Sequence, residues 1–123
     1  MALKMRKSPM RPDPEACPIG TCMDLIGGMW TPNTIWYLSG GARRFSELRE
    51  DVKPISAKML STRLKEMESI GIVVRTVVDT SPPSVEYSLT PLGRELVPVI
   101  EAIARVGYKL KREQGKKRIS LAR

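Results

Sequence analysis

Apolar side chains recur every three or four residues between Ala57 and Ile70, which is the spacing of one buried side of a helix. Ser56 precedes this segment and is a favoured N-cap, while Gly71 follows it and is typical of a helix end. The pattern therefore predicts a helix over residues 57–70 with three core-facing residues, namely Leu60, Leu64 and Met67.

Two shorter amphipathic segments are predicted near the N-terminus. The first runs from Pro18 to Ile26 and stops at two glycines, because proline suits the first helical position and glycine ends helices. The second opens at Thr31, which is expected to be the N-cap because Pro32 follows it. This second helix is expected to end at the Ser-Gly-Gly run of residues 39–41.

A very short strand and a further helix are expected before the helix at 57–70. Residues 42–45 are assigned to the strand, and Ser46 is expected to cap a helix from Glu47 to about Val52. Pro54 then forces the chain out of helical conformation, since proline restricts the residue before it.

The chain after Gly71 changes to the composition and period of strands. Residues 72–78 are rich in β-branched side chains, and residues 85–90 alternate apolar and polar positions. The Pro-rich segment between them predicts a hairpin. Thr90 and the proline after it then open a long final helix, in which Pro98 should cause a kink. The apolar stripe of that helix is Leu92, Leu96, Val99, Ile100, Ile103 and Leu110.

The order of these elements predicts the fold class. Two helices joined by a tight turn and followed by a β-hairpin describe a winged helix-turn-helix, mainly α with a small hairpin as the wing. The prolines at positions 12 and 14 oppose a helix, so residues 1–15 are expected to be a flexible arm. Residues 16–113 are then the folded domain, and residues 114–123 a basic tail.

The side of the helix at 57–70 that faces away from the core carries cations and hydroxyls. Lys58, Thr62 and Lys65 fall opposite the apolar side, Ser61 lies at the flank, and Ser56 projects from the N-terminus. The first two turns contain no acid, whereas an ordinary exposed helix mixes Glu and Lys. A DNA major groove admits such a helix and repels carboxylates, so this side is a candidate DNA contact. The alternative is a plain amphipathic helix.

Four residues outside this helix are further candidates for contact with double-stranded DNA. Arg43 and Arg44 precede the third helix, Arg75 lies in the first strand of the hairpin, and Ser81 lies at its compact tip. A wing tip of this kind can approach the phosphate backbone or the minor groove. Alternatively, the arginines are only solvated and the prolines beside Ser81 only fix the turn.

Charge and composition narrow the function. The chain of 123 residues has a net charge of +8 and no histidine. Such a charge attracts nucleic acid, although it also fits an anionic membrane or an acidic partner. Without histidine, a Ser-His triad is excluded, and no phosphate loop or paired carboxylates indicate an enzyme. Two cysteines five residues apart form no metal site, and no cofactor is expected. No apolar run is long enough for a membrane span or signal peptide, so we expect a cytoplasmic protein.

Several motifs resemble one family of bacterial regulators. "LIGGMW" at residues 25–30, "RRFSELRE" at 43–50, "ISAKMLSTRLKEMESIGIVVR" at 55–75 and "VEYSLTPLGREL" at 85–96 are similar to HxlR-type winged helix-turn-helix proteins. The resemblance implies a homodimeric transcription factor whose recognition helix is 57–70 and whose wing is 72–89. It also implies that the terminal helices form the dimer interface. The final helix supports this because its stripe exceeds what one small core needs; its expected contacts are Leu96, Val99, Ile100, Ile103 and Leu110.

The same resemblance suggests an effector. Some family members sense oxidants or electrophiles through a cysteine in an N-terminal "CP" motif, which corresponds here to Cys17 and Pro18. Cys17 lies at a helix start, where unpaired N–H groups favour a thiolate; the alternative is an inert thiol in the dimer interface. Asn33 and Thr34 depart from the aliphatic residues usual in the family, which marks either a small-molecule pocket or a different packing of the helix.

These observations lead to one main hypothesis and one alternative. The main hypothesis is a dimeric bacterial regulator that reads an inverted-repeat operator with residues 57–70 and contacts the DNA backbone with residues 72–89. The alternative is a winged-helix module for protein–protein contact without specific DNA binding. The first predicts affinity for DNA that falls steeply with salt, and the second does not.

Overall fold

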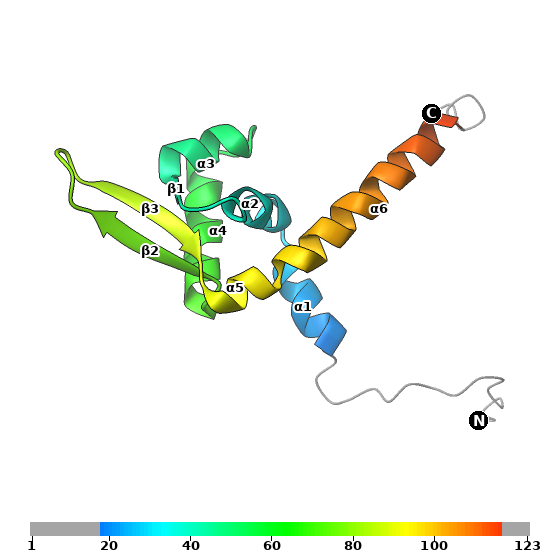
Figure 1. Ribbon diagram of the computed structural model, residues 1–123, viewed down its shortest axis with the longest axis horizontal. Helices are drawn as coiled ribbons and strands as arrows, with labels where there is room; N and C mark the ends of the chain where they lie inside the picture. The colour runs from blue at the N-terminus through cyan, green and yellow to red at the C-terminus, as the bar shows by residue number, and fades with distance from the viewer. Residues whose placement is uncertain (1–17, 117–123) are drawn as a thin grey trace.

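The computed structural model describes residues 18–116 and places a small sheet and five helices around one core, from which a sixth, long helix projects (Figure 1). The elements follow the chain in the order α1 (Pro18–Ile26), α2 (Thr31–Leu38), β1 (Arg43–Arg44), α3 (Phe45–Asp51), α4 (Ala57–Ile70), β2 (Val73–Val78), β3 (Ser84–Leu89), α5 (Pro91–Glu95) and α6 (Val97–Lys116). The predicted winged helix-turn-helix fold is confirmed by this order.

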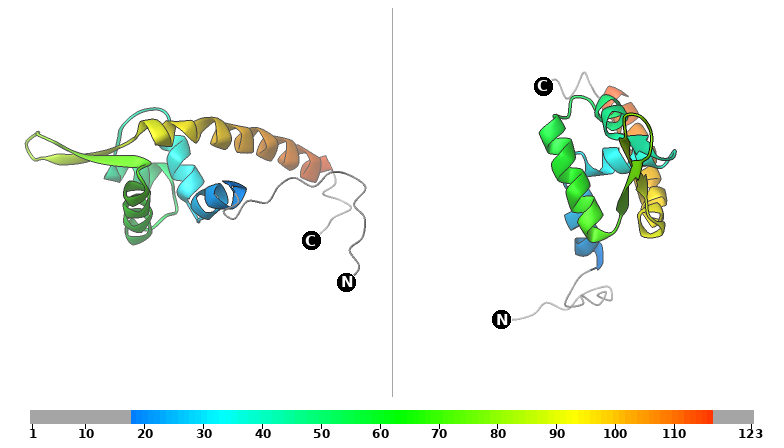
Figure 2. Two further views of the ribbon diagram at one scale, coloured as in Figure 1. Left: turned by 90° about the horizontal axis from the view of Figure 1, so that it is seen from below. Right: turned by 90° about the vertical axis from the view of Figure 1, so that its left-hand side faces the viewer.

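The three strands form one antiparallel sheet in the order β1-β3-β2. The hairpin of β2 and β3 pairs over its whole length, from Val73 opposite Leu89 to Val78 opposite Ser84. The hairpin and α6 project from opposite ends of the body, as Figure 1 and the left view of Figure 2 show. The body between them therefore holds the core.

The core is made by the apolar sides of the helices and the base of the hairpin. Leu60, Leu64 and Met67 of α4 are each 1% exposed or less, so the predicted core side of this helix is confirmed. They belong to one cluster that reaches from α1 to the first turns of α6 and that also includes Ile26, Ile35, Leu38, Leu48, Val52, Ile55, Ile72, Val73, Leu89 and Ile100.

The ends of α4 are built as the sequence predicts. The Ser56 hydroxyl accepts a hydrogen bond from the Met59 N–H at 3.0 Å, which satisfies one of the unpaired donors of the first turn. At the other end Gly71 has φ 91, a left-handed conformation that costs glycine little. The two caps fix the first and last residues of α4, and with them the length of the polar side that is expected to contact DNA.

Two predicted N-caps are wrong. Helix α2 begins at Thr31 itself, with Trp30 before it in a left-handed conformation at φ 75, and the Thr31 side chain is buried. Helix α3 begins at Phe45, and its cap is Arg44, whose backbone N–H donates to the Glu47 carboxylate at 2.8 Å. Helix α2 therefore starts one residue earlier, and α3 two residues earlier, than the nearest capping hydroxyl suggests.

The predicted final helix is divided into α5 and α6. Thr90 caps α5 as expected, since its hydroxyl accepts from the Gly93 N–H at 3.0 Å. The helix then breaks at Leu96, whose N–H donates to the Gly93 carbonyl at 3.0 Å. Pro98 explains the break because it has no N–H for the carbonyl four residues earlier, that of Arg94. Helix α6 continues to Lys116, past residue 114 where the basic tail was expected to begin.

Candidate nucleic-acid interface

The outer side of α4 has the geometry of a helix that could enter a groove. Lys58, Thr62 and Lys65 are all exposed, and Ser61 at the flank is half-buried. The Thr62 hydroxyl donates to the Lys58 carbonyl at 3.0 Å, which leaves its oxygen lone pairs directed outward. This helix has no acidic residue in its first turn. The side therefore presents cations and hydroxyls to solvent along its first two turns.

Among the elements that the structure describes, none covers that side of α4. Figure 2, right, shows α4 along the left edge of the body, with α6 on the opposite side and with strand β2, which follows α4 and contacts it, at its lower end. Its buried side packs on the core, and its C-terminal half faces α1. Within residues 18–116, no ion pair engages Lys58 or Lys65. Both ammonium groups are thus available to phosphates.

The hairpin carries the other candidates away from the body. Arg75 lies exposed in β2, and Ser81 lies exposed in the turn between the strands. The turn is closed locally, since the Thr80 hydroxyl donates to the Pro82 carbonyl at 2.7 Å. Among the described residues no ion pair holds Arg75. The wing therefore offers one free cation and a short polar tip.

The two arginines of β1 differ in their availability. Arg43 forms an ion pair with Asp51, with Nη2 to Oδ2 at 2.7 Å and Nε to the same oxygen at 2.9 Å. Arg44 is exposed, its backbone N–H donates to the Glu47 carboxylate, and no ion pair within residues 18–116 engages its guanidinium. The ion pair of Arg43 therefore links β1 to the last residue of α3. The guanidinium of Arg44, in contrast, is available to an external anion.

The structure of α2 explains one of its two polar residues, Asn33 and Thr34, that stand where the family usually has aliphatic residues. The Thr34 side chain is fully buried, and its hydroxyl donates to the Trp30 carbonyl at 2.7 Å. A buried hydroxyl satisfied within its own helix needs no ligand. Asn33, in contrast, is exposed beside the cleft between α2 and α6. Thr34 is thus explained by packing.

Comparison with known proteins assigns the chain to a family. The family model described as an HxlR-like helix-turn-helix matches residues 25–115. The chain belongs to the HxlR family. The expected resemblance is confirmed, and with it the class of the protein, because HxlR proteins are DNA-binding transcriptional regulators and not enzymes. None of the helices within residues 18–116 is long and apolar enough to cross a membrane.

Individual HxlR-like relatives share most of their length with the chain. YdeP of Bacillus subtilis strain 168, described as an uncharacterized HTH-type transcriptional regulator, is 42% identical over 99 residues, covering 80% of this chain and 77% of YdeP. The structure of the redox regulator HypR in its oxidized form is 39% identical with a TM-score of 0.72, covering 76% of this chain and 96% of HypR. Diamide-treated YodB of B. subtilis is 35% identical with a TM-score of 0.66, covering 77% of this chain and 95% of YodB.

The apolar residues of α6 divide between two surfaces. Ile100 is 5% exposed and belongs to the core of the chain itself, and Leu96 packs partly against that core. Val99, Ile103 and Leu110 are 38%, 49% and 56% exposed. The sequence reasoning missed Val106, which is 49% exposed on the same side. Its signal was present, because residues 99, 103, 106 and 110 follow the four-three-four spacing of a coiled-coil seam.

The structure describes one of the two cysteines, and it assigns no function to that one. Cys17 lies outside the described residues. Cys22 in α1 is a free, half-buried thiol. Helix α1 also exposes Ile19 and Met23, so its outer side is apolar, as is the seam of α6.

Proposed function

We propose that this HxlR protein is a dimeric, sequence-specific regulator in which α4 reads the bases of its operator. The observation that carries the proposal is the exposed, acid-free side of α4, with Lys58, Thr62 and Lys65 pointing away from the core. Hydroxyls and ammonium groups can bond base edges or phosphates in a major groove. The opposite side of the helix fixes the orientation of this side, because Leu60, Leu64 and Met67 are each 1% exposed or less.

The wing and the arginine of β1 anchor the protein on the sugar–phosphate backbone. Arg75 and Ser81 contact the backbone from the hairpin, and Arg44 contacts it beside α3. Arg43 makes no direct contact in this proposal, since its guanidinium is paired with Asp51 at 2.7 Å, which compensates its charge. Contacts of this kind set the position of the protein on the duplex and carry little sequence information.

Two copies of the chain associate through α6. Its exposed seam of Val99, Ile103, Val106 and Leu110 is apolar and has no partner within residues 18–116. A two-fold dimer presents two α4 helices to successive major grooves, about 34 Å apart, and so selects an inverted repeat. Ile100 takes no part, because it is buried in the core of each copy.

The base-reading role is tested by a triple substitution. Lys58→Ala, Thr62→Ala and Lys65→Ala together are expected to abolish binding to the operator in a gel-shift titration, while circular dichroism shows an unchanged fold. The control is Arg105→Ala with Arg112→Ala, which removes the same two positive charges from the exposed surface of α6. The proposal predicts that the control retains most of its operator affinity. A triple variant that binds as tightly as the control would contradict it.

Salt separates this proposal from a winged-helix module that contacts only proteins. Each phosphate neutralised by a lysine or arginine releases counterions, so the logarithm of DNA affinity falls linearly with the logarithm of salt concentration. We expect a slope of several units on an operator fragment found by footprinting the region upstream of the gene. Binding that is absent at low salt, on that region and on random DNA alike, would favour the protein-binding module.

A redox response through Cys17 is the second candidate function. It is favoured by the likeness to HypR, which is described as a redox regulator in an oxidized form. In the sequence Cys17 directly precedes Pro18, the first residue of α1, and the unpaired backbone N–H groups of a helix N-terminus favour the reactive thiolate. Oxidation would thereby act at the start of α1, the helix that exposes the apolar side chains of Ile19 and Met23.

The thiol is tested by comparing two serine variants. Diamide is expected to change the operator affinity of the parent and of Cys22→Ser, and to leave that of Cys17→Ser unchanged in the same gel-shift assay. A Cys17→Ser protein that still responds to diamide would exclude the sensor role of this residue.

A further inference from the structure

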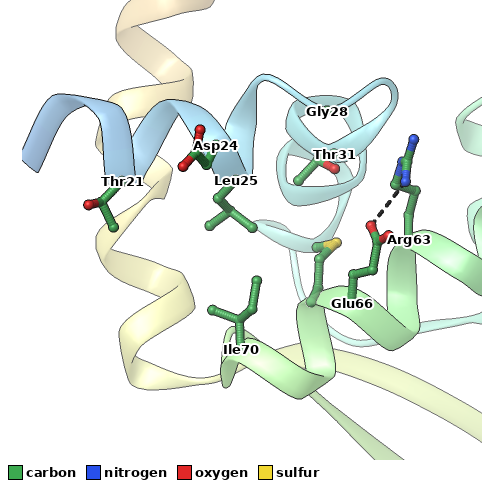
Figure 3. A pocket seen from close by; sticks show the side chains of 9 residues that line it. Thr21, Asp24, Leu25, Gly28, Thr31, Arg63, Glu66 and Ile70 are labelled. Carbon is green, nitrogen blue, oxygen red and sulfur yellow. Dashed lines mark hydrogen bonds and ion pairs between the residues drawn. The ribbon is translucent and has the colours of Figure 1, made fainter. Parts of the chain in front are cut away.

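A cavity of about 500 Å³ lies between α1, the turn before α2, and the C-terminal half of α4 (Figure 3). Leu25 of α1 and Ile70 of α4 point toward one another across it. Met67 completes its apolar wall. A volume of this size lies within the range of small-molecule sites in proteins. The lining supplies the apolar surface that such a ligand would need.

The charges around this cavity leave one carboxylate without compensation. Glu66 pairs with Arg63, with Oε1 to Nη1 at 3.0 Å. Arg63 is further held by the Met29 carbonyl, which accepts from Nε at 2.8 Å. Asp24 lines the α1 wall, and within residues 18–116 no hydrogen bond or ion pair engages its carboxylate. The cavity therefore has a local negative charge on a chain whose net charge is +8.

We propose that this cavity binds a hydrophobic monocation. The apolar body of the ligand would lie between Leu25, Met67 and Ile70, and its positive charge beside Asp24. The charge of the whole chain repels cations, so affinity must come from the local carboxylate and the apolar walls together. Anions of the same shape gain nothing from this cavity, because Arg63, the one cation that lines it within residues 18–116, is already bound by Glu66 and Met29.

The cavity joins α4 to the N-terminal helix. Arg63, Glu66, Met67 and Ile70 form its α4 wall, while Thr21, Asp24 and Leu25 form its α1 wall. A ligand that contacts both walls favours one spacing of the two helices, and any DNA affinity that depends on this spacing changes with it. This regulatory consequence rests on the proposed role of α4 in reading DNA, whereas the binding site itself does not.

Tetraphenylphosphonium and tetraphenylborate are suitable probes because they have nearly the same shape and opposite charge. Isothermal titration calorimetry of the full chain in 0.3 M salt is expected to give micromolar binding of the cation. Asp24→Asn should weaken it at least fivefold. Asp79→Asn is the matched control, since it removes the same charge from an exposed residue at the end of β2 and should leave the affinity unchanged. Ile70→Ala, at a side chain 53% exposed, should weaken binding without unfolding the protein.

Three outcomes would overturn the site. One is absence of tetraphenylphosphonium binding at millimolar concentration, as expected if a second copy of the chain covers the cavity. Another is equal affinity of Asp24→Asn and Asp79→Asn for the cation. The third is binding of tetraphenylborate by the parent chain as tight as its binding of tetraphenylphosphonium. None of these measurements uses DNA, so the site and the proposed function of α4 fail separately. A cation that binds without changing operator affinity would remove only the regulatory consequence.

Discussion

A single glycine sets the approach of α5 to the start of the hairpin. A Cβ atom at Gly93 would lie 2.2 Å from the Ile72 carbonyl oxygen and 3.0 Å from the Ile72 side chain. That carbonyl also accepts from the Thr90 N–H at 2.9 Å. The contact is backbone against backbone, so no side chain can move aside to relieve it.

Gly93→Ala is therefore expected to lower the free energy of unfolding by about 2–3 kcal/mol, the cost of overpacking a tight contact. Urea denaturation measures the change. Gly115→Ala is the control, because no atom lies within 4 Å of its added Cβ; it should raise stability by about 0.5 kcal/mol, as for a helical Gly to Ala change. Equal stabilities of the two variants would contradict the close approach at Gly93.

At the scale of elements, substitution of the N-cap serine of α4 and of a serine within the helix distinguishes an effect on stability from an effect on DNA binding. Ser56→Ala removes the cap bond to the Met59 N–H and is expected to lower the free energy of unfolding by about 1 kcal/mol. Ser61→Ala removes a half-buried hydroxyl that lies inside the helix and does not cap it. Because alanine is the better helix former, the free energy of unfolding should stay equal or rise slightly.

Thermal denaturation of the two serine variants checks the stability difference, and operator titration at a temperature where both are folded checks the contact. If Ser61 touches DNA, Ser61→Ala binds more weakly although it is no less stable. A Ser56→Ala protein as stable as the parent would show that the cap contributes nothing.

The helices whose ends were predicted correctly have residues at both ends that start or stop a helix by themselves. Pro18 and the two glycines after Ile26 bound α1, and Ser56 and Gly71 bound α4, so local chemistry is sufficient for both. The cap of α2 failed because the left-handed conformation of Trp30 has no local signal. For α3, the backbone of Arg44 and the carboxylate of Glu47 replaced the expected hydroxyl.

The candidate site shows the same division between local and distant information. The polar side of α4 follows from helical period alone, and its exposure agrees. The pairing of Arg43 with Asp51 could not be predicted, since it depends on the orientation of α3 relative to β1. Nor could the burial of Ile100, because period alone does not tell which side of a doubly apolar helix meets the core.

At the scale of the whole molecule, α6 projects beyond the body with more apolar surface than the chain itself covers (Figure 1). Residues 99, 103, 106 and 110 lie within about 60° of arc when each residue is stepped by about 100°. They form a straight seam that a second helix of the same kind can fill. A charge placed in its centre would be buried between two copies without a partner, which is strongly unfavourable.

Val106→Glu is therefore expected to raise the dimer dissociation constant at least tenfold, as measured by sedimentation equilibrium. Arg112→Glu is the control, since it adds the same carboxylate to α6 about 150° away from the seam and should leave association unchanged. Because each copy then meets only one half-site, Val106→Glu should also bind a full inverted repeat little better than a single half. A variant that stays dimeric would assign association to another surface, such as the apolar outer side of α1, and would leave the seam without a role.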